Sequence, residues 1–191
     1  MIIGISGYSG SGKDLVGTII QEISLNKWSI KKWAGKLKVI ASLLTNIPVE
    51  KFEDQEFKKT DLGPEWGMTV RDFLQKLGTD AIRDGLHTNA WVNALMADYK
   101  AIDYNDDEQP ELPNWIITDL RFPNEMQSIK ANGGITIRVV RPNNKEVTLD
   151  LHPSETALDG VTFDYEIIND GTLEDLVKKV EDIILHINLN K

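Results

Sequence analysis

The chain opens with the stretch Ile2-Ile3-Gly4-Ile5-Ser6-Gly7-Tyr8-Ser9-Gly10-Ser11-Gly12-Lys13-Asp14, and this stretch decides the fold. Its first five residues are mostly apolar and β-branched, which predicts a short buried strand. Beyond Lys13, apolar residues return at helical spacing, so the glycine-rich turn joins a strand to a helix. The spacing of Gly7, Gly12 and Lys13 matches the phosphate-binding loop G-x-x-x-x-G-K-[ST] up to its last position.

A loop of this kind binds phosphate mainly through its backbone. The glycines let consecutive N–H groups face one anion, the helix N-terminus adds partial positive charge, and the lysine reaches the outer phosphates. Asp14 stands where a Ser or Thr hydroxyl would normally touch Mg²⁺, and we expect its carboxylate to face the cation directly or through water. A glycine-rich turn without a ligand is the alternative, which the flanking strand and helix disfavour. The predicted phosphate contacts of the loop are Gly7, Ser9, Gly10, Ser11, Gly12, Lys13 and Asp14.

Composition sets the class of protein. The chain has 191 residues, a formal net charge of −9 and no cysteine. Its length favours a single domain over residues 1–191 with room for a small insert. The acidity argues against non-specific nucleic-acid binding, and the lack of cysteine excludes a disulfide framework or a thiol nucleophile. No apolar run approaches the roughly 20 residues of a membrane span, and no signal peptide is evident, so we expect a cytoplasmic protein without a membrane partner.

Strand and helix patterns alternate along the chain. We expect strands at 2–6, 28–34, 115–118, 135–140 and 165–168, and helices at 13–23, 36–44, 70–82, 90–99, 123–132 and 173–187. Such alternation predicts a parallel sheet with helices on both faces. The segments 46–68, 103–113 and 143–162 show no regular pattern and are expected to be loops; the first is either a binding loop or a solvated surface loop.

Charged and polar side chains follow the ends of the predicted strands. In a parallel sheet, ligands bind in the crevice at the carboxyl ends of the strands. Together with Lys13, the cations at these ends would therefore form a site for several phosphates on an otherwise acidic protein. The residues that follow strands two to five are Lys36, then Asp119 and Arg121, then Arg141, then Asn169 and Asp170.

Several phosphates and a metal indicate phosphoryl transfer, in which catalysis is mostly positioning and charge neutralisation. We expect Asp119 to hold Mg²⁺ together with Asp14, and Arg121 to bridge the donor and acceptor phosphates; the alternatives are a strand-ending aspartate and a surface ion pair. Arg71 could bind an acceptor phosphate bidentately, or be a solvated helix residue. Arg141 could stack on a purine, or simply end a strand.

These residues carry a family resemblance. The chain resembles the phage-type deoxynucleoside monophosphate kinases, a branch of the P-loop nucleotide kinases. The more specific blocks are Arg71–Asp80 with Trp91 downstream, and Thr118–Glu125. The G-K-D ending of the phosphate loop is usual in such kinases. The remaining blocks are Gly7–Asp14, Gly133-Gly134, Val139–Pro142, His152–Glu155 and Ile168–Thr172.

The resemblance implies a three-layer α/β/α P-loop kinase fold with a five-stranded parallel sheet. It implies ATP as donor with Mg²⁺, a deoxynucleoside 5′-monophosphate as acceptor, and the host cytoplasm as location if the protein is phage-encoded. Lys13, Arg121 and Asp119 would be catalytic. An insert at about 36–100 would bind the acceptor, and a short lid at about 141–164, poor in arginine, would leave charge neutralisation to Arg121 and Arg138. The implied acceptor residues are Lys36, Arg71, Gln75, Asp80, Trp91 and Arg121, and the implied ATP contacts outside the loop are Arg141, Asn169 and Asp170.

Two other interpretations stay open. A kinase for another small acceptor, of the dephospho-coenzyme A or phosphomevalonate type, would carry a similar phosphate loop, although the Arg71–Asp80 block with Trp91 favours a nucleotide. A nucleotide-binding regulator without turnover is the alternative from another class. The accepted bases, the exclusion of ribonucleotides and the oligomeric state, a dimer among the options, are not determined by these residues.

Overall fold

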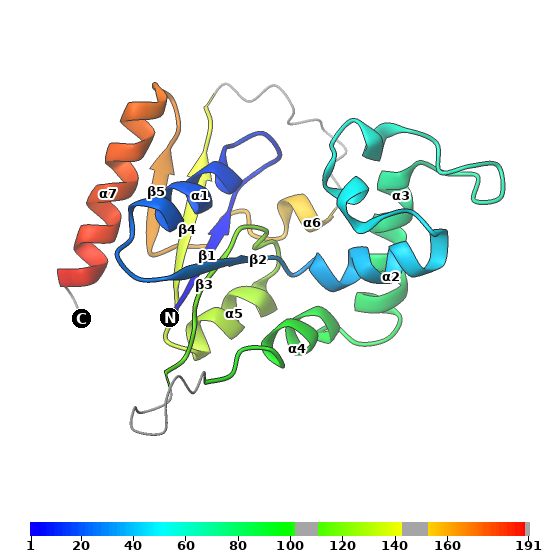
Figure 1. The fold of residues 1–191 in the computed structure, drawn as a ribbon, viewed down its shortest axis with the longest axis horizontal. Helices are drawn as coiled ribbons and strands as arrows, with labels where there is room; N and C mark the ends of the chain where they lie inside the picture. The colour runs from blue at the N-terminus through cyan, green and yellow to red at the C-terminus, as the bar shows by residue number, and fades with distance from the viewer. Residues whose placement is uncertain (102–110, 143–152, 190–191) are drawn as a thin grey trace. The chain divides into compact units, whose positions relative to one another are not determined.

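We analysed a computed structural model, which describes residues 1–101, 111–142 and 153–189 (Figure 1). The chain forms two compact units. The first unit comprises Met1–Lys32 and Tyr99–Lys191 and contains the sheet; the second comprises Trp33–Asp98 and is helical. The predicted insert of about 36–100 overlaps the second unit.

The sheet of the first unit has five parallel strands in the order β2-β3-β1-β4-β5. The first strand lies at its centre, where Ile3 pairs with Ile116 on one side and with Ile135 on the other. This arrangement confirms the predicted five-stranded parallel sheet. The strands are β1 (Ile2–Ser6), β2 (Trp28–Lys31), β3 (Asn114–Ile117), β4 (Ile135–Val140) and β5 (Tyr165–Ile168).

Helices cover both faces of the sheet. On one face α1 (Lys13–Ile23) packs against α7 (Leu173–Leu189), and Ile3 and Ile5 of β1 join their apolar core. On the other face lies α5 (Pro123–Ala131), whose Ile129 comes so close that a Cβ at Gly4 would stand 2.4 Å from its Cδ1. Alternate residues of one strand thus face opposite layers, as a pleated strand requires.

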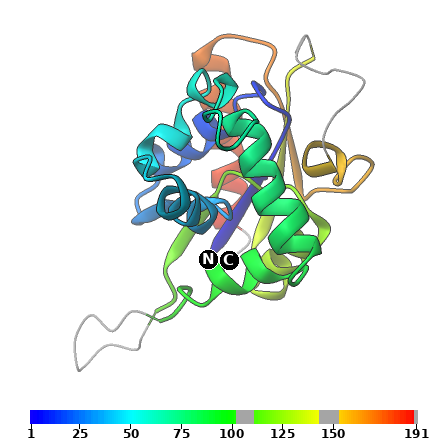
Figure 2. The ribbon, with the colours of Figure 1, turned by 90° about the vertical axis from the view of Figure 1, so that its right-hand side faces the viewer.

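The second unit is built from α2 (Gly35–Thr45), α3 (Val70–Gln75), α4 (Ala90–Met96) and three further helical segments. Figure 2 shows α3 running on into the π-helix η3 as one continuous helical segment. A core of Ala41, Phe52, Leu62, Val70 and Phe73 holds the unit together. The further segments are the 3₁₀-helices η1 (Val49–Glu53) and η2 (Phe57–Lys59) and the π-helix η3 (Lys76–Asp84).

The structure differs from the sequence analysis in several elements, among them the helix predicted over 90–99, which ends at Met96. Residues 46–68 are not structureless, because they form two 3₁₀-helices around the fully buried Phe52. Strand β2 ends at Lys31 and not at residue 34, because its neighbour β3 ends at Ile117, the last paired residue. The helix predicted over 70–82 widens into η3 after Gln75, and the segment 143–162 contains the short helix α6 (Pro153–Thr156).

Among the helices within the described ranges, none has the length and apolar character needed to cross a membrane.

Candidate functional site

The phosphate loop connects β1 to α1 as predicted, and its shape depends on two glycines. Gly12 adopts φ 97° and ψ 11°, a left-handed conformation that favours glycine, and Lys13 then begins α1. A Cβ at Gly12 would lie 2.6 Å from Nδ2 of Asn169, which donates a hydrogen bond to the Ser11 carbonyl over 2.9 Å. Asn169, expected at the ATP site, therefore contacts the backbone of the loop itself.

Gly7 is needed because the loop folds back on it. A Cβ there would stand 2.4 Å from Oγ of Ser11 and 2.6 Å from the carbonyl of Val139. The hydroxyl of Ser11 is buried and has no hydrogen-bond partner among the described residues. A buried polar group without a partner is costly, so an unpaired hydroxyl inside this loop suits a site that a polar ligand fills.

Lys13 is partly buried among charged side chains of both signs. Its Nζ donates to the carbonyl of Tyr8 over 3.4 Å, so the ammonium curls back over the loop. Burial lowers the pKa of Lys13, and the nearby guanidinium of Arg121 lowers it further, while the carboxylates of Asp14, Glu155 and Asp119 act in the opposite direction. Lys13, Arg121 and Asp119, the three predicted catalytic residues, thus lie within electrostatic reach of one another.

Asp14 is held by two neighbours in the first unit. The hydroxyl of Thr118, just past β3, donates to Oδ1 of Asp14 over 2.7 Å, and Nζ of Lys32 lies 3.4 Å from the same oxygen. Partial burial acts to raise the pKa of Asp14, but the Thr118 hydrogen bond and the charges of Lys32 and Lys13 outweigh it and hold this pKa below its usual range. Asp14 is therefore a carboxylate at neutral pH.

The turn after β3 is fixed by a buried acid. The carboxyl of Glu125 accepts hydrogen bonds from the backbone N–H groups of Arg121 (2.8 Å) and Phe122 (3.0 Å). Burial and the negative charge of Asp119 raise the pKa of Glu125 to about 8. The side chain of Arg121 donates to the Glu155 carboxylate and to the Ser154 carbonyl of α6, the latter over 3.3 Å. Asp119 and Arg121, which follow β3, thus lie near Lys13.

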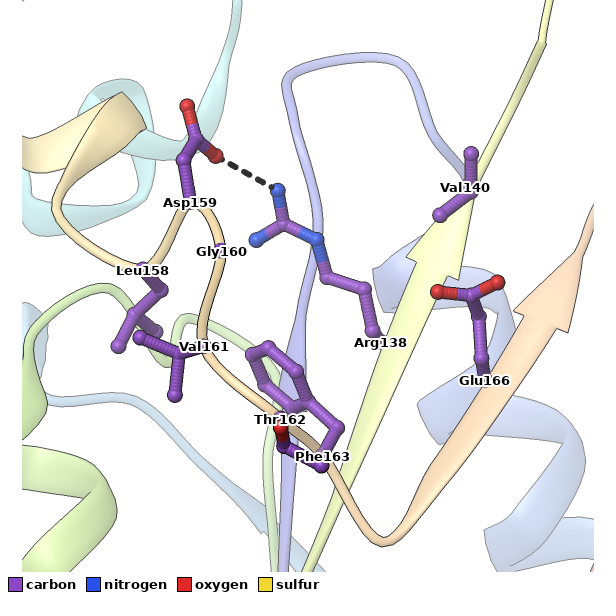
Figure 3. Close-up of a pocket in the computed structure, with 9 residues that line it drawn as sticks. All are labelled: Arg138, Val140, Leu158, Asp159, Gly160, Val161, Thr162, Phe163 and Glu166. Carbon is purple, nitrogen blue, oxygen red and sulfur yellow. Dashed lines mark hydrogen bonds and ion pairs between the residues drawn. The ribbon is translucent and has the colours of Figure 1, made fainter.

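A pocket of about 410 Å³ lies beside Arg138 of β4 in the first unit (Figure 3). The guanidinium points at Asp159, to which it donates over 3.1 Å, and it also donates to Ser6 over 3.0 Å. The hydroxyl of Tyr8 donates to the same Asp159 over 2.7 Å. Arg138 therefore ties the end of β1 to the segment before β5, and Tyr8 ties the phosphate loop to the same Asp159. The expected role of Arg138 toward phosphate stays a prediction. The pocket is lined by Arg138, Val140, Leu158, Asp159, Gly160, Val161, Thr162, Phe163 and Glu166.

The remaining predicted ATP contacts differ in their surroundings. Arg141 extends to the phosphate loop, where its Nη1 lies 3.5 Å from the Gly10 carbonyl. Asp170 instead forms an ion pair with Lys179 of α7 at 2.8 Å. His152, from the fourth block of the resemblance, lies outside the described residues.

The predicted acceptor residues other than Arg121 lie in the second unit. Arg71 and Gln75 are one helical turn apart on α3, so their side chains leave the same face. Trp91 donates its indole N–H to the carbonyl of Gly78 over 2.8 Å and so ties α4 to η3. Lys36 forms an ion pair with Asp98 at 3.0 Å, and Asp80 is exposed on η3.

The acidic side chains suit a metal that arrives with its substrate. Among the described residues, no group of three or more His, Cys, Asp or Glu side chains could enclose a cation. Magnesium is usually held by one or two carboxylates together with waters and substrate phosphates, and not by an all-protein cage. Asp14 at the phosphate loop, with Asp119 after β3, fits that pattern.

Comparison with known proteins identifies the family. The family model described as deoxynucleotide monophosphate kinase matches residues 28–180. A protein of Acanthamoeba polyphaga mimivirus, provisionally described as a deoxynucleotide monophosphate kinase, is 30% identical over 189 residues, which is 94% of each chain.

The chain belongs to the deoxynucleotide monophosphate kinase family. This confirms the predicted resemblance and the predicted class, a phosphate-transferring enzyme. The deoxynucleotide monophosphate kinase of Enterobacteria phage T4 is 34% identical over 116 residues, which cover 61% of this chain and 45% of the phage protein. Shikimate kinase from Acinetobacter baumannii, in complex with shikimate, shares the fold, with a TM-score of 0.50 at 16% identity over 98% of this chain and 94% of that one.

Several contacts of this kinase escaped the sequence analysis. Lys32 is a further cation beside the phosphate loop in the first unit, and the predicted strand, which ran on to residue 34, hid its position at the end of β2. Thr118 and Glu125 lie in a block that the resemblance quoted, but their partners, Asp14 and the turn at Arg121, depend on packing that no spacing reveals. Tyr8 occupies an unspecified position of the loop motif, so the motif carries no signal for its bond to Asp159.

Proposed function

We propose that this kinase transfers the γ-phosphate of ATP to a deoxynucleoside 5′-monophosphate, forming ADP and the deoxynucleoside diphosphate. Membership of the deoxynucleotide monophosphate kinase family supports the reaction. The observation that carries it is the phosphate loop. This loop follows β1, the central strand of a parallel sheet, and α1 begins directly after it at Lys13, so the helix N-terminus and the loop amides can bind an anion.

The ATP polyphosphate is assigned to the loop. Backbone N–H groups of Gly10, Gly12 and Lys13 would hold the β-phosphate region, since the N–H of Ser11 donates to the Tyr8 carbonyl over 3.1 Å. The ammonium of Lys13 would reach the phosphate being transferred. Asn169 fixes the backbone of the loop through Ser11, and Arg141 lies beside Gly10. Their positions support a donor site on the first unit.

Asp14 and Asp119 are the residues that would hold Mg²⁺. When bound, the metal would neutralise charge on the donor phosphates. Asp14 is ionised, and its side chain is 62% exposed, so it can accept a hydrated cation without the loop rearranging. Asp119 adds a second negative charge near Lys13.

The acceptor is assigned to residues of the second unit, and the acceptor role of Arg121 stays a prediction. Arg71 and Gln75, which share a face of α3, would bind the monophosphate and the base, and Lys36, Asp80 and Trp91 would complete the site. A nucleoside monophosphate is largely ionised at neutral pH, so it attacks without a strong general base. The reaction then depends on cations that align the two phosphates.

An acceptor panel tests this proposal. Steady-state ADP formation would be measured with Mg²⁺·ATP and each deoxynucleoside monophosphate, each ribonucleotide, dephospho-coenzyme A and phosphomevalonate. We expect kcat/KM for at least one deoxynucleotide to exceed that for the last two by about 10³-fold or more, because a site built to hydrogen-bond its substrate rejects others strongly. Turnover confined to either of the last two acceptors, or absent with all of them, would overturn the assignment.

The Arg71→Ala substitution tests the acceptor side separately. Losing a bidentate arginine contact should raise KM for the monophosphate by about tenfold or more and leave the affinity for ATP within about twofold. The exposed Lys51 of the same unit provides the matched control, and Lys51→Ala should change neither constant. Equal losses of affinity for the monophosphate and for ATP would show that Arg71 does not belong to the acceptor site.

A further inference from the structure

We propose that Thr118 is a positioning residue of the phosphate loop: its hydroxyl at the end of β3 orients the carboxylate of Asp14 toward the metal of the bound nucleotide. In P-loop NTPases the loop supplies a hydroxyl and a carboxylate follows a neighbouring strand, and the two share Mg²⁺. In this chain the loop itself supplies a carboxylate, Asp14, and the end of β3 supplies the Thr118 hydroxyl next to Asp119. The proposal rests on the proposed use of Mg²⁺·ATP.

The contact between the two residues is direct and enclosed on one side. The Thr118 hydroxyl donates to Oδ1 of Asp14 over 2.7 Å, although the residues are 104 positions apart in the chain. Thr118 is 1% exposed, so its hydroxyl has little access to water. A buried hydroxyl needs a partner, and here that partner is the one carboxylate of the phosphate loop.

Packing determines the direction of the Thr118 hydroxyl. Its methyl group lies under α1, where a Cβ at Gly17 would stand 2.5 Å from Cγ2 of Thr118. Gly17 and Asp14 are three residues apart and so share a face of α1. Because a β-branched side chain has few rotamers, the methyl group beneath Gly17 leaves the hydroxyl to face Asp14.

The orientation leaves one carboxylate oxygen for the cation. Lys32 also contacts Oδ1, at 3.4 Å, so both contacts described for the Asp14 carboxylate fall on the same oxygen. The side chain remains 62% exposed, and Oδ2 can therefore accept a metal ion or a metal-bound water. Partners that orient a metal ligand typically change metal affinity by about 10- to 100-fold when they are lost.

The test compares Thr118→Val, which removes the hydroxyl but keeps the shape, with Thr118→Ser, which keeps the hydroxyl. Calorimetry would measure the affinity of each protein for ATP with and without Mg²⁺, and turnover would be followed against Mg²⁺ concentration. We expect Thr118→Val to weaken Mg²⁺·ATP binding about tenfold or more, to leave metal-free ATP within about twofold, and to raise the half-saturating Mg²⁺ concentration. Thr118→Ser keeps the hydroxyl but loses the methyl group that orients it, so all three values should lie between those of the parent and the valine variant.

Control variants separate this role from a structural one. Thr18→Val, on the same helix, removes a hydroxyl that contacts only the backbone carbonyl of Asp14 and should leave Mg²⁺·ATP affinity unchanged. Thr118→Cys, which replaces the hydroxyl by a weak donor, repeats the test if the valine variant does not fold. The proposal is overturned if the valine or cysteine variant binds Mg²⁺·ATP as tightly as the parent, or if its affinity for metal-free ATP falls by the same factor. It is also overturned if Thr118→Ser recovers none of the affinity that Thr118→Val loses. Failure of the parent protein to bind Mg²⁺·ATP would instead overturn the proposed function.

Discussion

Lys13 shows how one side chain can be prepared for an anionic ligand. Burial and the charge of Arg121 both disfavour its ammonium, while three carboxylates partly offset them. A polyphosphate would supply the compensating negative charge that this position lacks. The folded protein thus holds cationic charge at a cost in stability, and binding of the ligand recovers it.

Replacing Lys13 by alanine should therefore abolish turnover without harming the fold. We expect kcat to fall by at least about 100-fold, the usual effect of removing one donor to developing charge, with a melting temperature no lower than that of the parent. Lys27→Ala, at an exposed position of the first unit, is the matched control. A Lys13→Ala enzyme within about threefold of the parent would contradict the role given to the loop.

Glu125 makes folding stability depend on pH. Its pKa is raised from 4.5 to about 8, so between these values the native state retains a proton that the unfolded state has lost. The stability that this group contributes is full below pH 4.5 and is lost as pH rises toward 8. Urea unfolding of the parent should show a loss on the order of a few kcal/mol across this window.

The Glu125→Gln variant should remove most of this dependence. Glutamine is neutral at every pH, and its carbonyl can still accept the N–H groups of Arg121 and Phe122. An equally steep decline in the variant would show that other groups cause the effect.

At the level of helices and strands, the start of α3 is a point where local sequence decides structure. The hydroxyl of Thr69 accepts the backbone N–H of Asp72 over 3.1 Å and donates to its carboxylate over 2.8 Å. This cap precedes the helical turn that carries Arg71 and Gln75. The N-cap at Thr69 therefore lies next to the proposed acceptor residues.

Removing the cap tests how firmly α3 is held. Thr69→Ala should lower the free energy of unfolding by about 1 kcal/mol, as loss of an N-cap hydroxyl usually does, whereas Thr69→Ser should be nearly neutral. Chemical denaturation of the three proteins would measure both differences. A destabilised serine variant would show that the methyl group of Thr69 matters more than its hydroxyl.

The same elements show what sequence reasoning can and cannot reach. Strands β4 and β5 end at the predicted residues because apolar runs with clear breakers on either side mark both. Because the carboxyl ends of parallel strands meet at one edge of the sheet, the sequence predicts that Asp119, Arg121 and Asn169 lie near the loop, and the structure places them there. Pairings such as Thr118 with Asp14 depend on the approach of α1 at Gly17, which is a property of packing and not of spacing.

Taken over the full chain, the kinase divides its residues between two compact units. The first, with the sheet, carries the phosphate loop and the residues proposed to hold ATP; the second, Trp33–Asp98, carries most of those proposed to hold the acceptor. On a chain of net charge −9, the cations Arg121 and Lys32 gather around the phosphate loop with Lys13, together with the carboxylates of Asp14, Asp119 and Glu155. Local cations on an acidic protein favour a small phosphorylated ligand over a nucleic acid.

Transfer of labelled phosphate tests the central claim most directly. The kinase would be incubated with ATP labelled at the γ-phosphate, Mg²⁺ and each deoxynucleoside monophosphate in turn, and the products separated. We predict label in the β-phosphate of a deoxynucleoside diphosphate, and none when the monophosphate is omitted. Label that stays in ATP or appears only as inorganic phosphate, with all of these acceptors, would contradict the account.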